Sequence, residues 1–274
     1  YMSIPIAHIG GGDPVFGNSD DPIRFAVSKL SSIHLCSNKF YYNNLVKLGE
    51  DKFRIFNVGN PIYTSISTVK KLSRDNLFKF LKIKIGKKFL VLIKHPLSSE
   101  VDNSSIQMKK TLDAISDFCN KFNFYCICIS PNTDPGSKKI KDEIQKFKND
   151  KNILFYETLP RYIFVNLIRN SEVLVGNSSM GILEAPFYKL PVVNIGNRQM
   201  GRLNAGNVEF TNYNKNNIIS KIKKACFDLK YRNNIKNLIN PFGNEKSAMK
   251  ISKIINNLDI KKNFSKWITK KNLI

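Results

Sequence analysis

The strongest chemical signal in the sequence lies in residues 172–188, EVLVGNSSMGILEAPFY. An apolar run ends at Gly176, and residues 177–179, Asn-Ser-Ser, then precede a predicted helix. Serine and asparagine cap helices, and the free amides at the start of a helix attract anions. This junction could therefore bind a phosphate group, although an ordinary capped helix has the same sequence.

Three more polar side chains near this segment could also contact a nucleotide. Glu184 lies about one and a half turns into the predicted helix, where its carboxylate could accept hydrogen bonds from the hydroxyl pair of a ribose. The next apolar run, residues 191–195, is followed by Arg198 and Arg202. Guanidinium groups at the carboxyl end of a parallel strand suit diphosphate oxygens. A solvated surface loop is the alternative interpretation of this segment.

His95 and Asn132 each follow another apolar run, FLVLIK and FYCICIS respectively. The carboxyl ends of parallel strands meet at one edge of a sheet, so both side chains are candidates for ligand contact. An imidazole at that edge could meet a phosphate or move a proton. A structural histidine, and a plain turn in the segment SPNTDPGS, are the alternatives.

The N-terminal segment joins a glycine-rich turn, HIGGGD, to a predicted helix over residues 22–31. Asp13 and Asp20 could do acid–base work there, while Asp20 as a helix cap fits the spacing equally well. The helix is expected to bury an apolar stripe formed by Ile23, Ala26, Val27 and Leu30. His34 lies inside the run SIHLCS and is expected to be a buried strand residue.

Short apolar runs alternate with amphipathic stretches along the chain. This alternation predicts an α/β fold with doubly wound parallel sheets. The expected strands are residues 4–9, 32–37, 89–93, 124–130, 153–157, 172–176 and 191–195, with a long helix over 104–122. No sequence repeat is evident.

A turn-rich segment near residues 60–65 predicts a domain junction. We expect residues 1–62 to be the C-terminal part of an N-terminal Rossmann-like domain, and residues 63–258 to be a complete second one. Residues 259–274 are expected to be a C-terminal helix or tail that packs back on the first domain. The strands and helices expected before this junction are too few to cover both faces of a parallel sheet, so we expect sequence to be missing upstream.

Composition narrows the functional classes. The formal charge is +23, but the lysines are spread along the chain without an arginine cluster or a nucleic-acid motif, so nucleic-acid binding is not expected. No run is long enough to span a membrane, and we expect a cytoplasmic protein. The cysteines include no C-x-x-C pair and are expected to be reduced and buried rather than metal ligands: Cys36, Cys119, Cys126, Cys128 and Cys226.

Taken together, these motifs resemble the hydrolysing UDP-N-acetylglucosamine 2-epimerases and their legionaminic-acid counterparts. The most specific pieces are GNSSMGILEAP and PVVNIGNRQMGR, supported by IPIAHIGGGD, SDDPIRFAVSKLS, FNVGNP, KHP and SPNTDPGSKK. The resemblance covers about residues 4–255. It implies a GT-B type fold of two Rossmann-like domains.

The resemblance also implies roles for individual residues. Ser178 and Ser179 would hold the diphosphate of a UDP-sugar, with Gly181 in the same motif, and Glu184 would hold the ribose. Arg198, Arg202 and His95 would contact the phosphate region, and Asn132 the nucleotide side. Asp20 matches a family carboxylate implicated in catalysis, and His95 is grouped with it as a catalytic candidate.

The implied reaction eliminates UDP across carbons 1 and 2 of the sugar and then adds water, which gives N-acetylmannosamine from UDP-N-acetylglucosamine. It needs no cofactor and no metal, and the resemblance implies a homo-oligomer for the longer form. Three departures bear on catalysis: Gly10 stands where Glu or His is usual, Phe25 where His is usual, and Asp13 where Glu is frequent. About a hundred family residues are absent, so the chain alone is expected not to turn over.

Three alternatives remain open at this point. The substrate could be UDP-N,N'-diacetylbacillosamine in place of UDP-N-acetylglucosamine. The chain could be a UDP-binding or subunit-pairing module without catalysis, which Gly10 would permit. It could also belong to a GT-B glycosyltransferase, although the R-Q-x-G-R segment favours the epimerases.

Overall fold

The computed structural model describes residues 4–15, 20–259, 262 and 264–270. The chain divides into two compact units, each described here by itself. Of the described residues, unit 1 comprises 4–15, 20–68 and those from 240 onward, and unit 2 comprises 69–239. Both contain parallel sheets with helices between the strands, which confirms the predicted fold class.

Unit 1 is built on a three-stranded parallel sheet in the order β1 (Ala7–Ile9), β2 (Ile33–Cys36) and β3 (Ile55–Asn57). The central strand β2 is buried throughout, and His34 is fully buried in it, as predicted. The helices of this unit are α1 (Asp20–Leu30), α2 (Lys39–Lys47), α3 (Ile62–Ser67), α11 (Ser247–Asn256) and α12 (Phe264–Ile268).

The described residues from Asn240 onward belong to unit 1, whereas the sequence predicts that residues up to 258 belong to the second domain. Apolar burial explains the difference, since Ile251 of α11 and Trp267 of α12 join the cluster formed by Ile33, Leu35 and Val58. The boundary of the second unit therefore falls before α11.

The buried Arg54 also ties the C-terminal segment to unit 1. Its guanidinium group donates hydrogen bonds to the backbone carbonyls of Lys266 and Trp267, both at 2.5 Å, and to that of Thr269. These carbonyls lie at the end of α12, where helical partners run out.

The predicted apolar stripe of α1 is wrong. Ile23, Val27 and Leu30 are 61%, 38% and 75% exposed, and Ala26 is exposed as well. In the described residues the helix buries Ser28 instead, and the Ser28 hydroxyl group lies 3.0 Å from Nδ1 of His8. Apolar spacing predicted the helix correctly but not the face that it buries.

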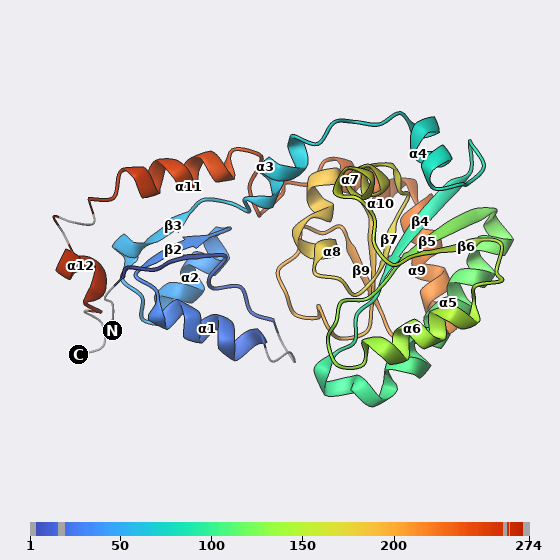
Figure 1. The fold of residues 1–274 in the computed structure, drawn as a ribbon, viewed down its shortest axis with the longest axis horizontal. Coiled ribbons are helices and arrows are strands. Elements are labelled where there is room, and N and C mark those ends of the chain that lie inside the picture. The colour runs from blue at the N-terminus through green and yellow to red at the C-terminus, as the bar shows by residue number, and fades with distance from the viewer. Residues whose placement is uncertain (1–3, 16–19, 260–261, 263, 271–274) are drawn as a thin grey trace. The chain divides into compact units, whose positions relative to one another are not determined.

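Unit 2 is built on a six-stranded parallel sheet in the order β6-β5-β4-β7-β8-β9. Figure 1 labels β4, β5, β6, β7 and β9 of this sheet. The strands are β4 (Lys88–Ile93), β5 (Phe124–Ile129), β6 (Ile153–Tyr156), β7 (Leu174–Gly176), β8 (Val192–Ile195) and β9 (Val208–Thr211). Its helices are α4 (Arg74–Phe80), α5 (Ser104–Phe122), α6 (Ser137–Lys146), α7 (Arg161–Asn170), α8 (Met180–Leu183), α9 (Lys215–Phe227) and α10 (Leu229–Lys236).

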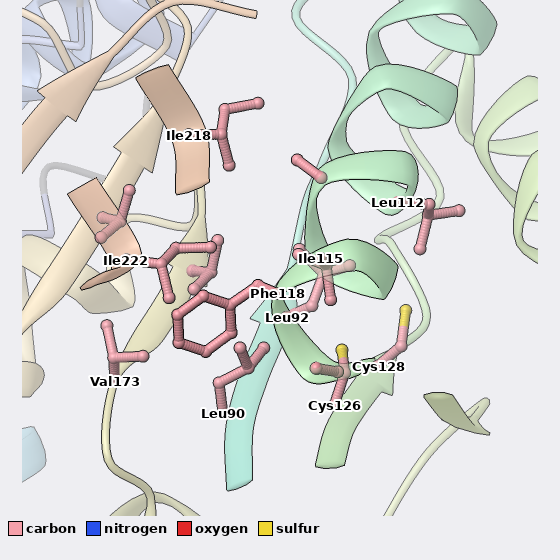
Figure 2. Close-up of a cluster of buried hydrophobic side chains, with 14 of the residues drawn as sticks. Leu90, Leu92, Leu112, Ile115, Phe118, Cys126, Cys128, Val173, Ile218 and Ile222 are labelled. Atoms are coloured by element: carbon pink, nitrogen blue, oxygen red, sulfur yellow. The ribbon is translucent and has the colours of Figure 1, made fainter. Parts of the chain in front are cut away.

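Alternate residues of β4 face two separate cores. Leu90 and Leu92 pack with α5, α6 and α9, as in the close-up of Figure 2, where they lie beside Phe118 and Ile222. Phe89, Val91 and Ile93 pack in the other core with α4 and α7. Helices therefore cover both faces of the sheet, as its apolar strands require.

All five cysteines are free and buried. Burial raises the pKa of Cys36 to about 11 and those of Cys128 and Cys226 to about 12. Within the described ranges no group of three or more His, Cys, Asp or Glu side chains could hold a metal ion. Among the same residues, no helix is long and apolar enough to cross a membrane.

Candidate functional site

The strand order of unit 2 contains one topological switch point. In chain order the strands β4, β5 and β6 run outward on one side, while β7, β8 and β9 run outward on the other. The two series separate between β4 and β7. Open α/β sheets bind ligands outside the carboxyl ends of the strands at such a point. His95 follows β4 and Asn177 follows β7, so they flank the switch point.

Asn177 cross-links the ends of three strands. It is 2% exposed, and its side-chain Oδ1 accepts a hydrogen bond from the backbone N–H of His95 at 2.7 Å. Its Nδ2 donates to the carbonyl of His95 at 2.8 Å. Its own carbonyl accepts from Arg198 Nη1 at 3.2 Å and from Gln199 Nε2 at 3.0 Å. In the sequence Asn177 is only a candidate helix cap, and this role of its side chain was not predicted.

Gly176 makes this close approach possible. Its φ is +130°, a backbone conformation that L-residues rarely adopt. A Cβ atom added there would lie 2.0 Å from the carbonyl oxygen of Ile93 on the neighbouring strand. Only glycine therefore fits where β7 ends, and the backbone N–H of Asn177 donates to Ile93 O at 3.1 Å directly after it.

The helix after Ser179 ends before Glu184, which was expected to lie about one and a half turns into it. α8 has four residues and is followed by a 3-10 turn over Ala185–Tyr188, which contains Pro186. Ser179 occupies the cap position without a side-chain capping bond, and Ser178 Oγ accepts from the backbone N–H of Met180 at a long 3.4 Å. So short a helix has a weak dipole, and an anion here would depend on the hydroxyl groups and amides themselves.

Gly181 lies in α8 where the helix meets β8. An added Cβ would lie 2.8 Å from Cγ1 of Val192, so glycine permits the close packing of this short helix on the sheet. The carbonyl of Gly181 accepts a hydrogen bond from Nδ2 of the buried Asn207 at 3.3 Å. These contacts give Gly181 a packing role in the architecture of the candidate site.

His95 is held as a neutral hydrogen-bond donor. Its Nδ1 accepts a hydrogen bond from the backbone N–H of Asn132 at 3.0 Å, which leaves the ring proton on Nε2. Burial, together with the positive charge of Arg198, lowers the pKa of His95 to about 4. At neutral pH the imidazole is thus uncharged and can donate from Nε2 to an oxygen atom.

Asn132 contributes mainly through its backbone. Its side-chain Nδ2 donates to the carboxylate of Asp134, and its Oδ1 accepts from Ser137 Oγ at 3.5 Å. These are the local bonds of the turn that the sequence also suggested. The turn fixes the backbone N–H that orients His95.

The segment after β8 places its two arginines differently. Arg198 is half-buried and bonds to the Asn177 carbonyl, as described above. Arg202 is 4% exposed, and its Nη1 donates to Oε1 of Gln199 at 2.7 Å. Gln199 therefore links Arg202 to Asn177. Sequence reasoning did not select Gln199, although the R-Q-x-G-R motif contained the signal.

Glu184 is half-buried at the end of α8. Burial raises its pKa above the ordinary carboxyl value, against the opposing effect of the positive charge of Arg161. Burial therefore disfavours the ionised form of this carboxylate in the folded chain.

The acidic candidates of the N-terminal segment lie in unit 1. Asp13 is 4% exposed and forms an ion pair with Arg24 at 2.9 Å, which gives it a structural role. Asp20 begins α1 and is exposed. Gly10 has a φ of +84° with open space around its Cα, so a glutamate there would be strained though not crowded.

The strand order of unit 2 and the polar groups at its switch point define a doubly wound α/β protein of the kind that binds ligands at that edge. Residues 1–256 match the family described as UDP-N-acetylglucosamine 2-epimerase, and the chain belongs to that family. The resemblance seen in the sequence motifs is thereby confirmed.

Curated relatives include two kinds of 2-epimerase. The chain is 34% identical over 209 residues to the GDP/UDP-N,N'-diacetylbacillosamine 2-epimerase (hydrolyzing) of Campylobacter jejuni, covering 76% of this chain and 54% of that protein. It is 31% identical over 224 residues to the UDP-N-acetylglucosamine 2-epimerase of Neisseria meningitidis, covering 81% and 57%. The chain thus spans little more than half the length of these relatives.

Solved structures share the fold. The UDP-GlcNAc 2-epimerase of Neisseria meningitidis bound to UDP-GlcNAc has a TM-score of 0.77 at 20% identity, over 94% of this chain and 71% of that one. The enzyme of Methanocaldococcus jannaschii, in complex with UDP-GlcNAc and UDP, has a TM-score of 0.75 at 23% identity, over 93% and 70%.

Proposed function

We propose that this chain is part of a hydrolysing UDP-sugar 2-epimerase and that unit 2 binds the UDP portion of the substrate. The observation that carries the proposal is the cross-link at Asn177, which joins the segments of His95, Ser178 and Arg198 at one edge of the sheet. Neutral donors and a guanidinium group at a switch point suit a diphosphate.

In this proposal the diphosphate lies against the Ser178 and Ser179 hydroxyl groups, with Arg198 and the Nε2–H of His95 donating to its oxygens. Arg202 supports the arginine side through Gln199, and Gly181 keeps α8 close to the sheet. Glu184 accepts from the ribose, and the Asn132 turn borders the nucleotide. Breaking the bond between carbon 1 and the diphosphate places negative charge on these oxygens, which the donors stabilise.

Loss of a proton from carbon 2 completes the elimination, and water then adds across the glycal to give the epimerised free sugar and UDP. His95 holds its proton on Nε2 and has a pKa of about 4, so we assign it to the leaving group rather than to abstraction of the carbon-2 proton. Asp20 of unit 1 is the proposed catalytic carboxylate.

UDP binding tests the first part of the proposal. We expect isothermal titration calorimetry to detect UDP binding to the folded chain, and uridine, which lacks both phosphates, to bind at least about tenfold more weakly. A folded chain, verified by circular dichroism, that takes up no UDP would contradict the proposal. Equal affinities for UDP and uridine would contradict the phosphate site.

The sugar of the substrate is a separate question. UDP-N,N'-diacetylbacillosamine is the second candidate, since the Campylobacter relative with 34% identity is named for it. A longer protein, made by joining this chain to the upstream segment of the Neisseria relative, can be offered both UDP-sugars in water. The sugar that yields UDP and a free 2-epimer identifies the substrate, whereas transfer only to an added acceptor would favour a glycosyltransferase.

Glu184→Gln is expected to stabilise the folded chain at pH 7 while weakening UDP binding about tenfold. The raised pKa of Glu184 means that the folded state disfavours its carboxylate, so stability falls as pH rises above the ordinary carboxyl range. The amide removes this cost. Urea unfolding at pH 7 should show a gain that disappears at pH 4, where wild-type Glu184 is protonated. A variant less stable than wild type at pH 7 would contradict the argument.

A further inference from the structure

Lys94 is a buried lysine that lies between β4 and His95. It is 1% exposed, and its Nζ lies 3.4 Å from Oε1 of Gln107 and 5.1 Å from the centre of the Tyr213 ring. The negative charge of Glu100 acts on it favourably and the positive charge of Arg198 unfavourably. Burying an ammonium group is costly unless it is paired, so its position at this edge of the sheet needs an explanation.

Two chains of contacts run from Lys94 to the segment that carries Arg198. In the first, Gln107 Nε2 donates to Glu100 Oε2 at 2.6 Å, and Glu100 Oε1 accepts from Asn197 Nδ2 at 3.2 Å. Asn197 directly precedes Arg198. The ammonium group is thus linked through one amide and one carboxylate to the residue next to a phosphate candidate.

The second chain passes through Tyr213. Its ring lies beside the Lys94 ammonium group, and a Cβ added to Gly196 would lie 2.1 Å from the Tyr213 hydroxyl oxygen. Gly196, with φ +82°, directly follows β8 and begins the same segment. Both routes therefore connect Lys94 to the turn of residues 196–198, which carries Arg198.

We propose that Lys94 is a positioning residue of the phosphate site: through Gln107, Glu100 and Tyr213 it holds the 196–198 turn, and its buried positive charge strengthens binding of the diphosphate. This inference rests on the proposed UDP site and adds a pH dependence to it. Burial lowers the pKa of Lys94 to about 8, so the charge is lost as pH rises through that value. A bound anion favours the protonated form, so UDP affinity should fall between pH 7 and 9.5.

The other groups that face Lys94 do not produce this change. His95 is already neutral, because its pKa is lowered to about 4. Burial raises the pKa of the Tyr213 hydroxyl group, which keeps it protonated over this range. Glu100 and Arg198 are the charged groups that act on the Lys94 ammonium group. The terminal phosphate of UDP titrates near a pH of roughly 6, below the range.

The test is calorimetric titration of UDP at pH 7, 8 and 9.5. Wild type should lose about threefold to tenfold in affinity over this range. Lys94→Met keeps the aliphatic length but removes the charge, and should bind about tenfold more weakly at pH 7 with no further loss at pH 9.5. Lys94→Arg keeps the charge at all three pH values and should also show a flat profile.

Lys88→Met is the matched control, because Lys88 lies at the exposed start of the same strand. It should keep the wild-type affinity and pH profile. If folded Lys94→Met binds UDP as wild type does at every pH, the inference is overturned and the UDP site stands. If Lys94→Met does not fold, equal pH profiles in wild type and Lys94→Arg overturn it. Absence of UDP binding by folded wild type overturns both proposals.

Discussion

Asn177→Ala is expected to lower the free energy of unfolding by about 3 kcal/mol and to weaken UDP binding at least about tenfold. The substitution removes both side-chain bonds to the backbone of His95 and leaves a small cavity at a position that is 2% exposed. The ends of β4 and β7 then lose their cross-link, so His95 and Ser178 no longer share a fixed geometry. Urea unfolding and UDP calorimetry measure the two effects.

Asn166→Ala provides the control. Asn166 is also in unit 2, is 1% exposed, and accepts a hydrogen bond from the backbone N–H of Leu72 while donating to the carbonyls of Lys70 and Tyr162. Its loss should cost similar stability with little change in UDP affinity. Equal binding losses in the two variants would mean that Asn177 acts only through general stability.

Asn177→Asp separates the roles further, because the carboxylate keeps the bond from the His95 N–H but cannot donate to the His95 carbonyl. It also adds a negative charge beside the proposed diphosphate. We expect a smaller loss of stability than in the alanine variant, together with a larger loss of UDP binding.

Gly176→Ala is the second large effect, with an expected loss of about 3 kcal/mol or more in unfolding free energy. The added methyl group would lie 2.0 Å from the carbonyl oxygen of Ile93, so the backbone of β4 would have to move away from it. The φ of +130° at this position would add backbone strain. Denaturant unfolding measures the loss, and a melting temperature should fall with it.

The control is Gly86→Ala. Gly86 has φ +88°, yet an added Cβ would meet no atom within 4 Å, so this variant isolates backbone strain. It should lose only about 1 kcal/mol. If the Gly86 and Gly176 variants were equally stable, the close approach of β7 to β4 would not be the reason for glycine at 176.

The sequence predicted the regular elements of unit 2 well where packing and local signals agree. The helix expected over 104–122 has the observed bounds of α5, and the runs at 89–93 and 124–130 became the interior strands β4 and β5. Continuous apolar runs are typical of strands buried on both faces, so their pattern is unambiguous.

Elements with weak local patterns were missed. β3 has three residues, and β9, at the edge of its sheet, is only partly buried along its length. Both depend on pairing with a neighbouring strand. The apolar stripe predicted for α1 failed for the opposite reason, since a good local pattern was overruled by the tertiary environment.

The candidate site was predicted as a set of residue types but not as a geometry. The positions of His95, Ser178 and Arg198 after predicted strands indicated that they could bind a ligand. The hydrogen bonds that join their segments pass through Asn177, whose side chain bonds to the backbone of His95, 82 positions earlier in the chain. The burial of Lys94 was also not predicted, because a lysine that follows an apolar strand is usually exposed to solvent. Only its 1% exposure shows otherwise.

The burial of all five thiols makes the chain well suited to site-specific labelling. Thiolates, not thiols, react with maleimide dyes, and the raised pKa values and burial of the native cysteines keep them unreactive in the folded protein. New cysteines at exposed positions, such as Lys47 in unit 1 and Asn149 in unit 2, would therefore carry the only dyes. Energy transfer between such a pair could follow the distance between the two units as UDP is added.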